Sequence, residues 1–204
     1  MTTAIDTLMN EHRVIEDVLT ALESAATSAA NGAQLDRNRV AEFADFFRNF
    51  ADTCHHGKEE DLLFKRMTDF GFPREHGPIA VMLFDHQTGR EHVGALRAIG
   101  EASGALATDE RASFVQHAEA YVALLRQHIQ KEDRVLYPMA AQTIPPADMA
   151  HLVSDFADFE RNVMGAGEHE RFHRLADFLV EAYRVKGGSP EGSSAGCGCH
   201  GHSR

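Results

Sequence analysis

The chain has 204 residues, of which 43% are hydrophobic, so it can bury the core of one or two domains. Its 20 Lys and Arg stand against 31 Asp and Glu, and the net charge of −11 argues against nucleic acid or an anionic membrane as a partner. No segment resembles a membrane span or a signal peptide, so we expect a cytoplasmic protein. The 13 His, beside no Trp, are an excess of the commonest protein ligand for transition metals.

Apolar residues recur at intervals of three and four between short breaks that contain Gly or Pro, and no segment alternates like a strand. This pattern predicts an all-α protein. Short connections between long amphipathic helices favour antiparallel neighbours, so we expect an up-down-up-down four-helix bundle with two additional C-terminal helices. The expected helices cover residues 3–30, 36–68, 78–103, 109–142, 147–164 and 168–185.

The predicted organisation has three parts: a bundle over residues 1–145, a helical extension packed on it over 146–186, and a tail over 187–204. The tail has no apolar periodicity and is expected to be disordered. It is either a solvated terminus or an accessory site for Zn, Cu or Ni, because it holds four soft and borderline metal ligands close together. These ligands are Cys197, Cys199, His200 and His202.

An internal repeat contains the candidate metal ligands. The segment from His55 to Lys65 aligns without a gap with the segment from His128 to Pro138, and the His, Lys, Glu and Leu positions coincide. Another His precedes each copy by a similar distance, which indicates a duplicated helical hairpin that supplies two His and one Glu from each half. The six candidates are His12, His55, Glu59, His86, His128 and Glu132.

The spacing within each copy suits metal binding. A His and a Glu four residues apart in a helix differ by about 40° in direction and about 6 Å in rise, so one face presents both. In an antiparallel bundle the four positions fall at one level. Burying six polar groups without partners is costly, whereas two metal ions bridged by carboxylates satisfy them all. Spacing does not fix the ion, so iron, zinc and manganese all stay open at this point.

The order His, His-x-x-x-Glu, His, His-x-x-x-Glu resembles the hemerythrin-like, or HHE cation-binding, domains over residues 3–142. The resemblance implies two iron ions in an oxo- or hydroxo-bridged centre, with Glu59 and Glu132 as bridges and the four His as terminal ligands. It also implies that a small oxidant, such as O2, peroxide or nitric oxide, is bound or consumed. Whether the chain is an enzyme stays open, because an oxygen, iron or redox sensor, an iron store and a structural dimetal bundle are alternatives.

Two positions depart from the oxygen-carrying hemerythrins. Their second His on the third helix corresponds to Arg90, which we expect to place positive charge beside an anionic oxygen species. Their last carboxylate corresponds to Asp133, but we prefer Glu132 because the repeat pairs it with Glu59. With two His for each iron, both ions would keep an exchangeable position, which suits reaction with an oxidant better than reversible oxygen carriage.

The other chemically active residues are assigned outside the ligand set. Tyr121 shares the inward stripe with His128 and, like Arg90, is a candidate for contact with a bound ligand or its access path. His56 lies four residues before Glu60, but this pair is out of register with the repeat, so we expect His56 at the surface. Packing, hydrogen-bonding or surface roles are expected for Cys54, His92, His117, His169 and His173. Metal ligation by His169 and His173 and a redox role for the Cys54 thiol stay open as alternatives.

Overall fold

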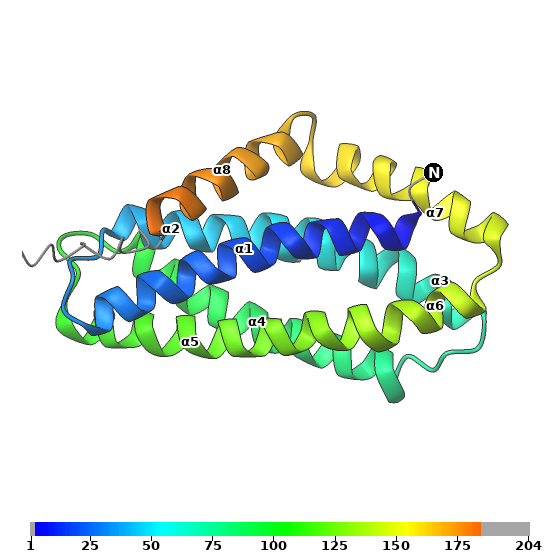
Figure 1. The fold of residues 1–204 in the computed structure, drawn as a ribbon, viewed down its shortest axis with the longest axis horizontal. Coiled ribbons are helices and arrows are strands. Elements are labelled where there is room, and N and C mark those ends of the chain that lie inside the picture. The colour runs from blue at the N-terminus through cyan, green and yellow to red at the C-terminus, as the bar shows by residue number, and fades with distance from the viewer. Residues whose placement is uncertain (1–2, 185–204) are drawn as a thin grey trace, which may run out of the picture.

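The structure is a computed structural model that describes residues 3–184, and over this range it contains helices and no strands (Figure 1). The predicted all-α class is confirmed, and the helices begin and end within two residues of their expected positions. Segments labelled η are π-helical and continue the α-helices beside them. The first four helical stretches are α1 (Ala4–Ala30); α2 (Arg37–Phe46) with η1 (Phe47–His56), η2 (Glu59–Leu63) and α3 (Phe64–Asp69); α4 (Gly77–Glu101); and α5 (Thr108–Lys131) with η3 (Glu132–Leu136) and α6 (Tyr137–Thr143).

Local sequence signals explain where the helices begin. Thr3 caps α1, because its hydroxyl accepts from the amide of Asp6 and the Asp6 carboxylate accepts from the Thr3 amide in return. Asp36 caps α2 by accepting from the amide of Asn38. Between these two helices Gly32 has a φ of 87°, a conformation that Gly adopts without strain and that turns the chain.

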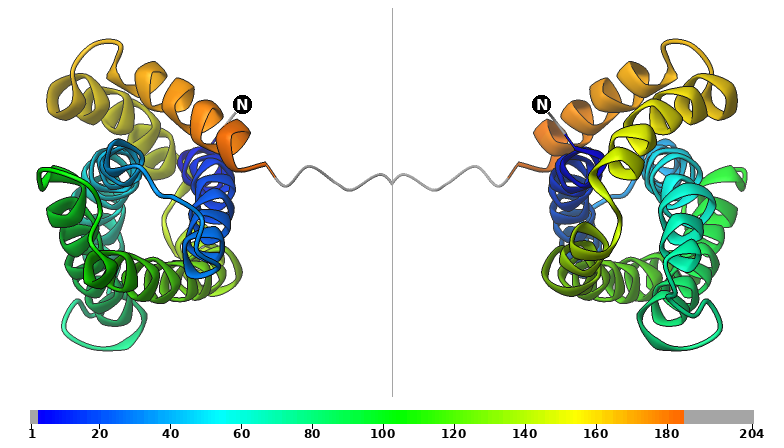
Figure 2. Two further views of the ribbon diagram at one scale, coloured as in Figure 1. Left: turned by 90° about the vertical axis from the view of Figure 1, so that its left-hand side faces the viewer. Right: turned by 90° about the vertical axis from the view of Figure 1, so that its right-hand side faces the viewer.

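The four stretches lie side by side around a shared interior, which is clearest when the molecule is viewed end-on (Figure 2). Helix α5 packs against α1 and α4, and α4 also packs against α2. The chain then continues into α7 (Pro146–Phe159), η4 (Glu160–Met164) and α8 (Glu168–Tyr183), of which α8 packs against α1 and α2. None of the described helices is long and apolar enough to cross a membrane. The predicted tail and its candidate metal ligands lie outside the described residues.

Two separate apolar clusters form the interior. The larger includes Ile15 and Phe114, and the smaller includes Leu8 and Leu136. On α1 the buried polar residue His12 lies between Leu8 and Ile15, so the polar groups form a layer between the clusters. This arrangement surrounds the polar layer with apolar side chains on both sides along the helix axes.

Candidate metal centre

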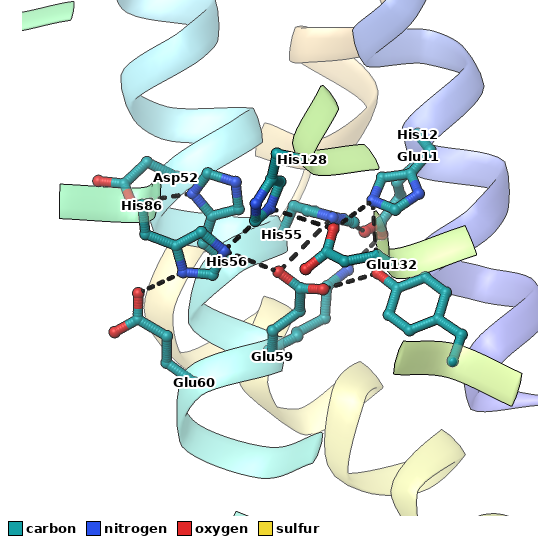
Figure 3. A network of polar contacts seen from close by, with 12 residues as sticks. Glu11, His12, Asp52, His55, His56, Glu59, Glu60, His86, His128 and Glu132 are labelled. Atoms are coloured by element: carbon teal, nitrogen blue, oxygen red, sulfur yellow. Dashed lines mark hydrogen bonds and ion pairs between the residues drawn. The ribbon is translucent and has the colours of Figure 1, made fainter. Parts of the chain in front are cut away.

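All six predicted ligands lie in the polar layer between the apolar clusters, and none is more than 1% exposed (Figure 3). With one further residue, His56, they form two groups in which the possible ligand atoms lie within 4.8 Å of one another. Glu59 belongs to both groups. We call these seven residues the ligand layer: one group is His12, His55, Glu59 and Glu132, and the other is His56, Glu59, His86 and His128.

The expectation that His56 lies at the surface is wrong. His56 is 3% exposed, and its ring stacks on that of His86 with 3.8 Å between centroids. Adjacent residues of an α-helix point about 100° apart, so two consecutive inward His were not expected. The segment η1, however, is π-helical, and both His55 and His56 are buried in it. The aligned position in the second half is Ile129, so the repeat gives no sign of this fifth imidazole.

Two carboxylates stand between the imidazoles. Glu132 Oε2 lies 3.3 Å from His12 Nε2 and 3.1 Å from His128 Nε2. Glu59 Oε2 lies 3.4 Å from His86 Nε2 and 3.9 Å from His55 Nε2. Among the described residues, four buried atoms of this layer lack a hydrogen-bond partner: His55 Nε2, Glu59 Oε2, and Glu132 Oε1 and Oε2. Buried polar atoms without partners are costly, so this donor set fits bound cations.

Each imidazole of the ligand layer has a carboxylate behind it, on Nδ1. An ionised carboxylate only accepts hydrogen bonds, so Nδ1 carries a proton and Nε2 is the ring nitrogen that faces the interior. This orientation is typical of His ligands in metal sites, where the carboxylate fixes the tautomer. The pairs are His12 with Asp133 at 2.7 Å, His55 with Glu11 at 2.8 Å, His56 with Asp52 at 3.3 Å, His86 with Glu60 at 2.7 Å, and His128 with Asp85 at 3.3 Å.

The internal repeat extends to these carboxylates. Glu11 and Asp85 directly precede the first His of each half, and Glu60 and Asp133 directly follow the Glu of each half. The π-helical segments η2 and η3 repeat as well, because each begins at that Glu. Such π-helical turns are frequent at functional sites. Asp133 therefore lies behind His12, while Glu132 lies in the ligand layer.

A cavity of about 230 Å³ reaches the ligand layer from the side of α4. His56 and His86 line it together with Arg90 and Tyr121. Arg90 donates to Asp52 at 2.9 Å and to Glu60 at 2.7 Å, so its charge is paired with the carboxylates behind the two imidazoles. The two residues proposed to contact a ligand thus lie at the cavity.

Tyr137 is a residue of the site that the sequence reasoning missed. Its hydroxyl donates to Glu59 Oε1 at 2.6 Å and lies 3.3 Å from His12 Nε2, and its ring stacks on His12. The aligned residue, Phe64, stacks on His86 in the same way but has no hydroxyl. The sequence did hold a sign of this role, because the two aligned positions of the repeat differ only by the hydroxyl of Tyr137.

Neighbouring charges and burial shift the pKa values of the imidazoles in the ligand layer. Burial disfavours protonation of His12, but its hydrogen bonds with Asp133 and Glu132 outweigh burial and raise its pKa to about 9. Burial is likewise outweighed at His128, where Glu132 and Asp85 raise the pKa to about 10. Burial and the neighbouring His86 instead lower the pKa of His56 well below its usual value. Cations that bind here must therefore displace protons from His12 and His128.

The remaining His and Cys of residues 3–184 lie outside the ligand layer. His92 and His117 contact each other through Nδ1 at 3.1 Å. The rings of His169 and His173, on α8, pack against Phe50. Cys54 is buried as expected, and burial raises the pKa of its thiol to about 12.

Comparison with known proteins agrees with this geometry. Uncharacterized proteins of Mycobacterium tuberculosis and Mycobacterium bovis are each 24% identical to the chain over 176 residues, which is 86% of this chain and 68% of theirs. No solved structure matches the chain significantly. The model of the hemerythrin HHE cation-binding domain matches residues 3–140, which include the whole ligand layer. The chain therefore belongs to the hemerythrin HHE cation-binding domain family.

Proposed function

We propose that the chain is a non-haem diiron protein that binds or reacts with a small oxidant, namely peroxide, O2 or nitric oxide. The observation that supports it best is the ligand layer itself, in which five carboxylate-backed imidazoles face two buried carboxylates. Imidazole and carboxylate ligands without thiolate suit iron, and they also suit manganese or zinc. The proposal includes an up-down-up-down antiparallel bundle over residues 1–145 and an extension over 146–186.

Each ion would have its own imidazoles. His12 and His55 would hold one ion, and His56, His86 and His128 would hold the other. Glu59 approaches imidazoles of both groups, as does Glu132, so either carboxylate could contribute to both positions. When bound, iron would supply redox chemistry and Lewis acidity toward a small oxidant.

The side chains around the ligand layer control what enters and where protons lie. The cavity beside His56 and His86 is smaller than the roughly 300 to 1,000 Å³ typical of drug-sized ligands, which favours molecules of a few atoms. The apolar clusters on both sides exclude bulk water. Tyr137 holds its hydroxyl proton against Glu59 Oε1, and burial together with Glu59 raises its pKa well above the usual value. This phenol is therefore a protonated hydrogen-bond donor at the carboxylate shared by both groups.

The direct test is reactivity of the iron-loaded protein. The protein is purified without oxygen, loaded with iron, and mixed separately with peroxide, O2 and nitric oxide while the absorption spectrum is followed. We expect charge-transfer bands that change with at least one of the three, and no change in a Glu59→Ala, Glu132→Ala double variant. An iron-loaded spectrum that responds to none of the three would contradict the proposal.

A sensor or an iron store is the alternative. The contact between η1 and η4 favours a sensor, because η1 carries His55 and His56 and so joins the extension directly to the site. A sensor should change its partner binding or oligomeric state with the redox state of the centre, whereas an oxidant-consuming protein should turn over many equivalents of peroxide or nitric oxide per iron. Size-exclusion chromatography of both redox states and measured turnover distinguish the two.

A further inference from the structure

The C-terminal extension approaches the ligand layer very closely beside His55 and His56. A Cβ atom on Gly57 would lie 2.7 Å from Cζ of Phe159, so a larger residue at this position would force the ring to move. The aligned residue in the second half of the repeat is Gln130, which is exposed. The sequence therefore departs from the repeat where the extension makes this contact.

A buried ion-pair chain links the extension to His55. Lys58 is 0% exposed and donates to Glu11 and, at 2.7 Å, to Glu160 of η4. Glu11 in turn accepts from His55 Nδ1 at 2.8 Å. Glu11, Glu160 and His169 could by themselves form a small cation site, but the Lys58 ammonium already pairs with both carboxylates. We therefore interpret this cluster as a structural link.

The equivalent chain in the second half of the repeat has no such link. Lys131 pairs with Asp85, which lies 3.3 Å from His128 Nδ1. The side chain of Lys131 is 41% exposed, and among the described residues it has no second carboxylate partner. The extension thus supplies one half of the ligand layer with a third charged group, and the two candidate metal positions differ as a result.

We propose that Glu160 is a positioning residue for His55 and that the extension thereby tunes one of the two metal positions. With Glu160 in place, Lys58 is shared between two carboxylates and Glu11 keeps a strong bond to the imidazole. Without this carboxylate, Lys58 pairs with Glu11 alone and competes more strongly with His55 for the Glu11 carboxylate. The hydrogen bond from His55 Nδ1 to Glu11 then weakens, and His55 Nε2 becomes a poorer metal ligand. This inference rests on the proposed metal centre.

The test compares Glu160→Gln with Glu168→Gln, the same change in the same extension. Glu168 pairs with Arg171 at 2.7 Å on α8 and has no contact with Lys58. Metal-free full-length protein is titrated anaerobically with Fe²⁺, and with Co²⁺ as a spectroscopic probe. Loss of a partner directly behind a His ligand costs about 10- to 100-fold in metal affinity, and Glu160 acts through two intervening groups, so we expect about tenfold at one site only. The second site, and both sites of Glu168→Gln, should keep their wild-type affinities.

Two further measurements separate positioning from loss of structure. In metal-free protein, the imidazole ¹⁵N resonances of His55 should shift in Glu160→Gln while those of His128 stay unchanged. Glu160→Asp, which keeps the charge, should recover most of the lost affinity. Unchanged affinities and unchanged His55 resonances in Glu160→Gln, with two ions still bound, would overturn the inference and leave the metal centre standing. Wild-type protein that binds neither ion would instead overturn the proposed function itself.

Discussion

His56 provides the sharpest mutational test, because the repeat places it outside the site and the folded chain places it inside. Replacement by Gln keeps a side chain of similar polarity and removes the imidazole that stacks on His86. The change leaves the other group of candidate ligands, around His12 and His55, intact. We therefore expect His56→Gln to weaken one of two metal positions selectively.

The size of this effect follows from the number of ligands in the group. Four side chains bring possible ligand atoms within 4.8 Å of one another around His56. Four-ligand zinc sites in small proteins are worth about 10 to 16 kcal/mol, or roughly 2.5 to 4 kcal/mol for each ligand. Since about 1.4 kcal/mol corresponds to a factor of ten, loss of His56 should weaken its ion by about 100-fold or more.

The assay is anaerobic titration with Fe²⁺ followed by iron analysis after gel filtration. With two iron ions supplied per chain, at a free concentration between the affinities of the intact and the weakened position, His56→Gln should retain about half of the wild-type iron. His92→Gln, which alters a His outside the ligand layer, should retain all of it. Equal iron content in wild-type and His56→Gln protein, together with equal affinities, would refute the assignment of His56 to the ligand layer.

Three other outcomes are expected. Gly94 lines the cavity, and a Cβ there meets nothing within 4 Å, so a larger side chain fits and would narrow the cavity. Gly94→Leu should therefore slow the association of nitric oxide with iron-loaded protein in stopped-flow experiments, whereas Ala98→Leu should not. Equal association rates would argue against this entrance. The pKa values of His12 and His128 are raised in the fold, so their protonated forms stabilise the metal-free protein. This stabilisation is complete below about pH 6.5 and is lost as the pH passes through about 9 and 10, so urea unfolding should show stability falling between pH 7 and 10. A rise in stability over this range would contradict the charge assignment. Removal of residues 187–204 should leave the iron content and spectrum unchanged and abolish only a weaker uptake of Zn, Cu or Ni; loss of iron would show that the tail completes the site.

Apolar periodicity predicted the helices closely because each long helix buries one continuous stripe. The first helix was expected over residues 3–30 and spans Ala4–Ala30, and the fourth was expected over 109–142 and ends at Thr143. The repeat likewise identified six residues that the fold brings into one layer. Both signals work because they reflect spacing along a regular helix.

The features that were missed depend on irregular backbone or on contacts distant in sequence. Burial of both His55 and His56 occurs in a π-helical segment that periodicity does not reveal. The contact between Lys58 and Glu160 joins positions far apart in the chain, and spacing along the sequence does not predict which residues of two distant segments meet. Glu11 could have been found, because it occupies the same place before His12 that Asp85 occupies before His86.

The central claim is that the ligand layer holds two metal ions, and anomalous X-ray scattering from crystals of the iron-loaded protein tests it most directly. Data collected on both sides of the iron absorption edge should give two peaks for each chain, one near His12 and His55 and one near His86 and His128. Glu59 and Glu132 should lie between the two peaks. A single peak, peaks only beside Glu160, or no peak in protein shown to be folded and supplied with iron would contradict the account.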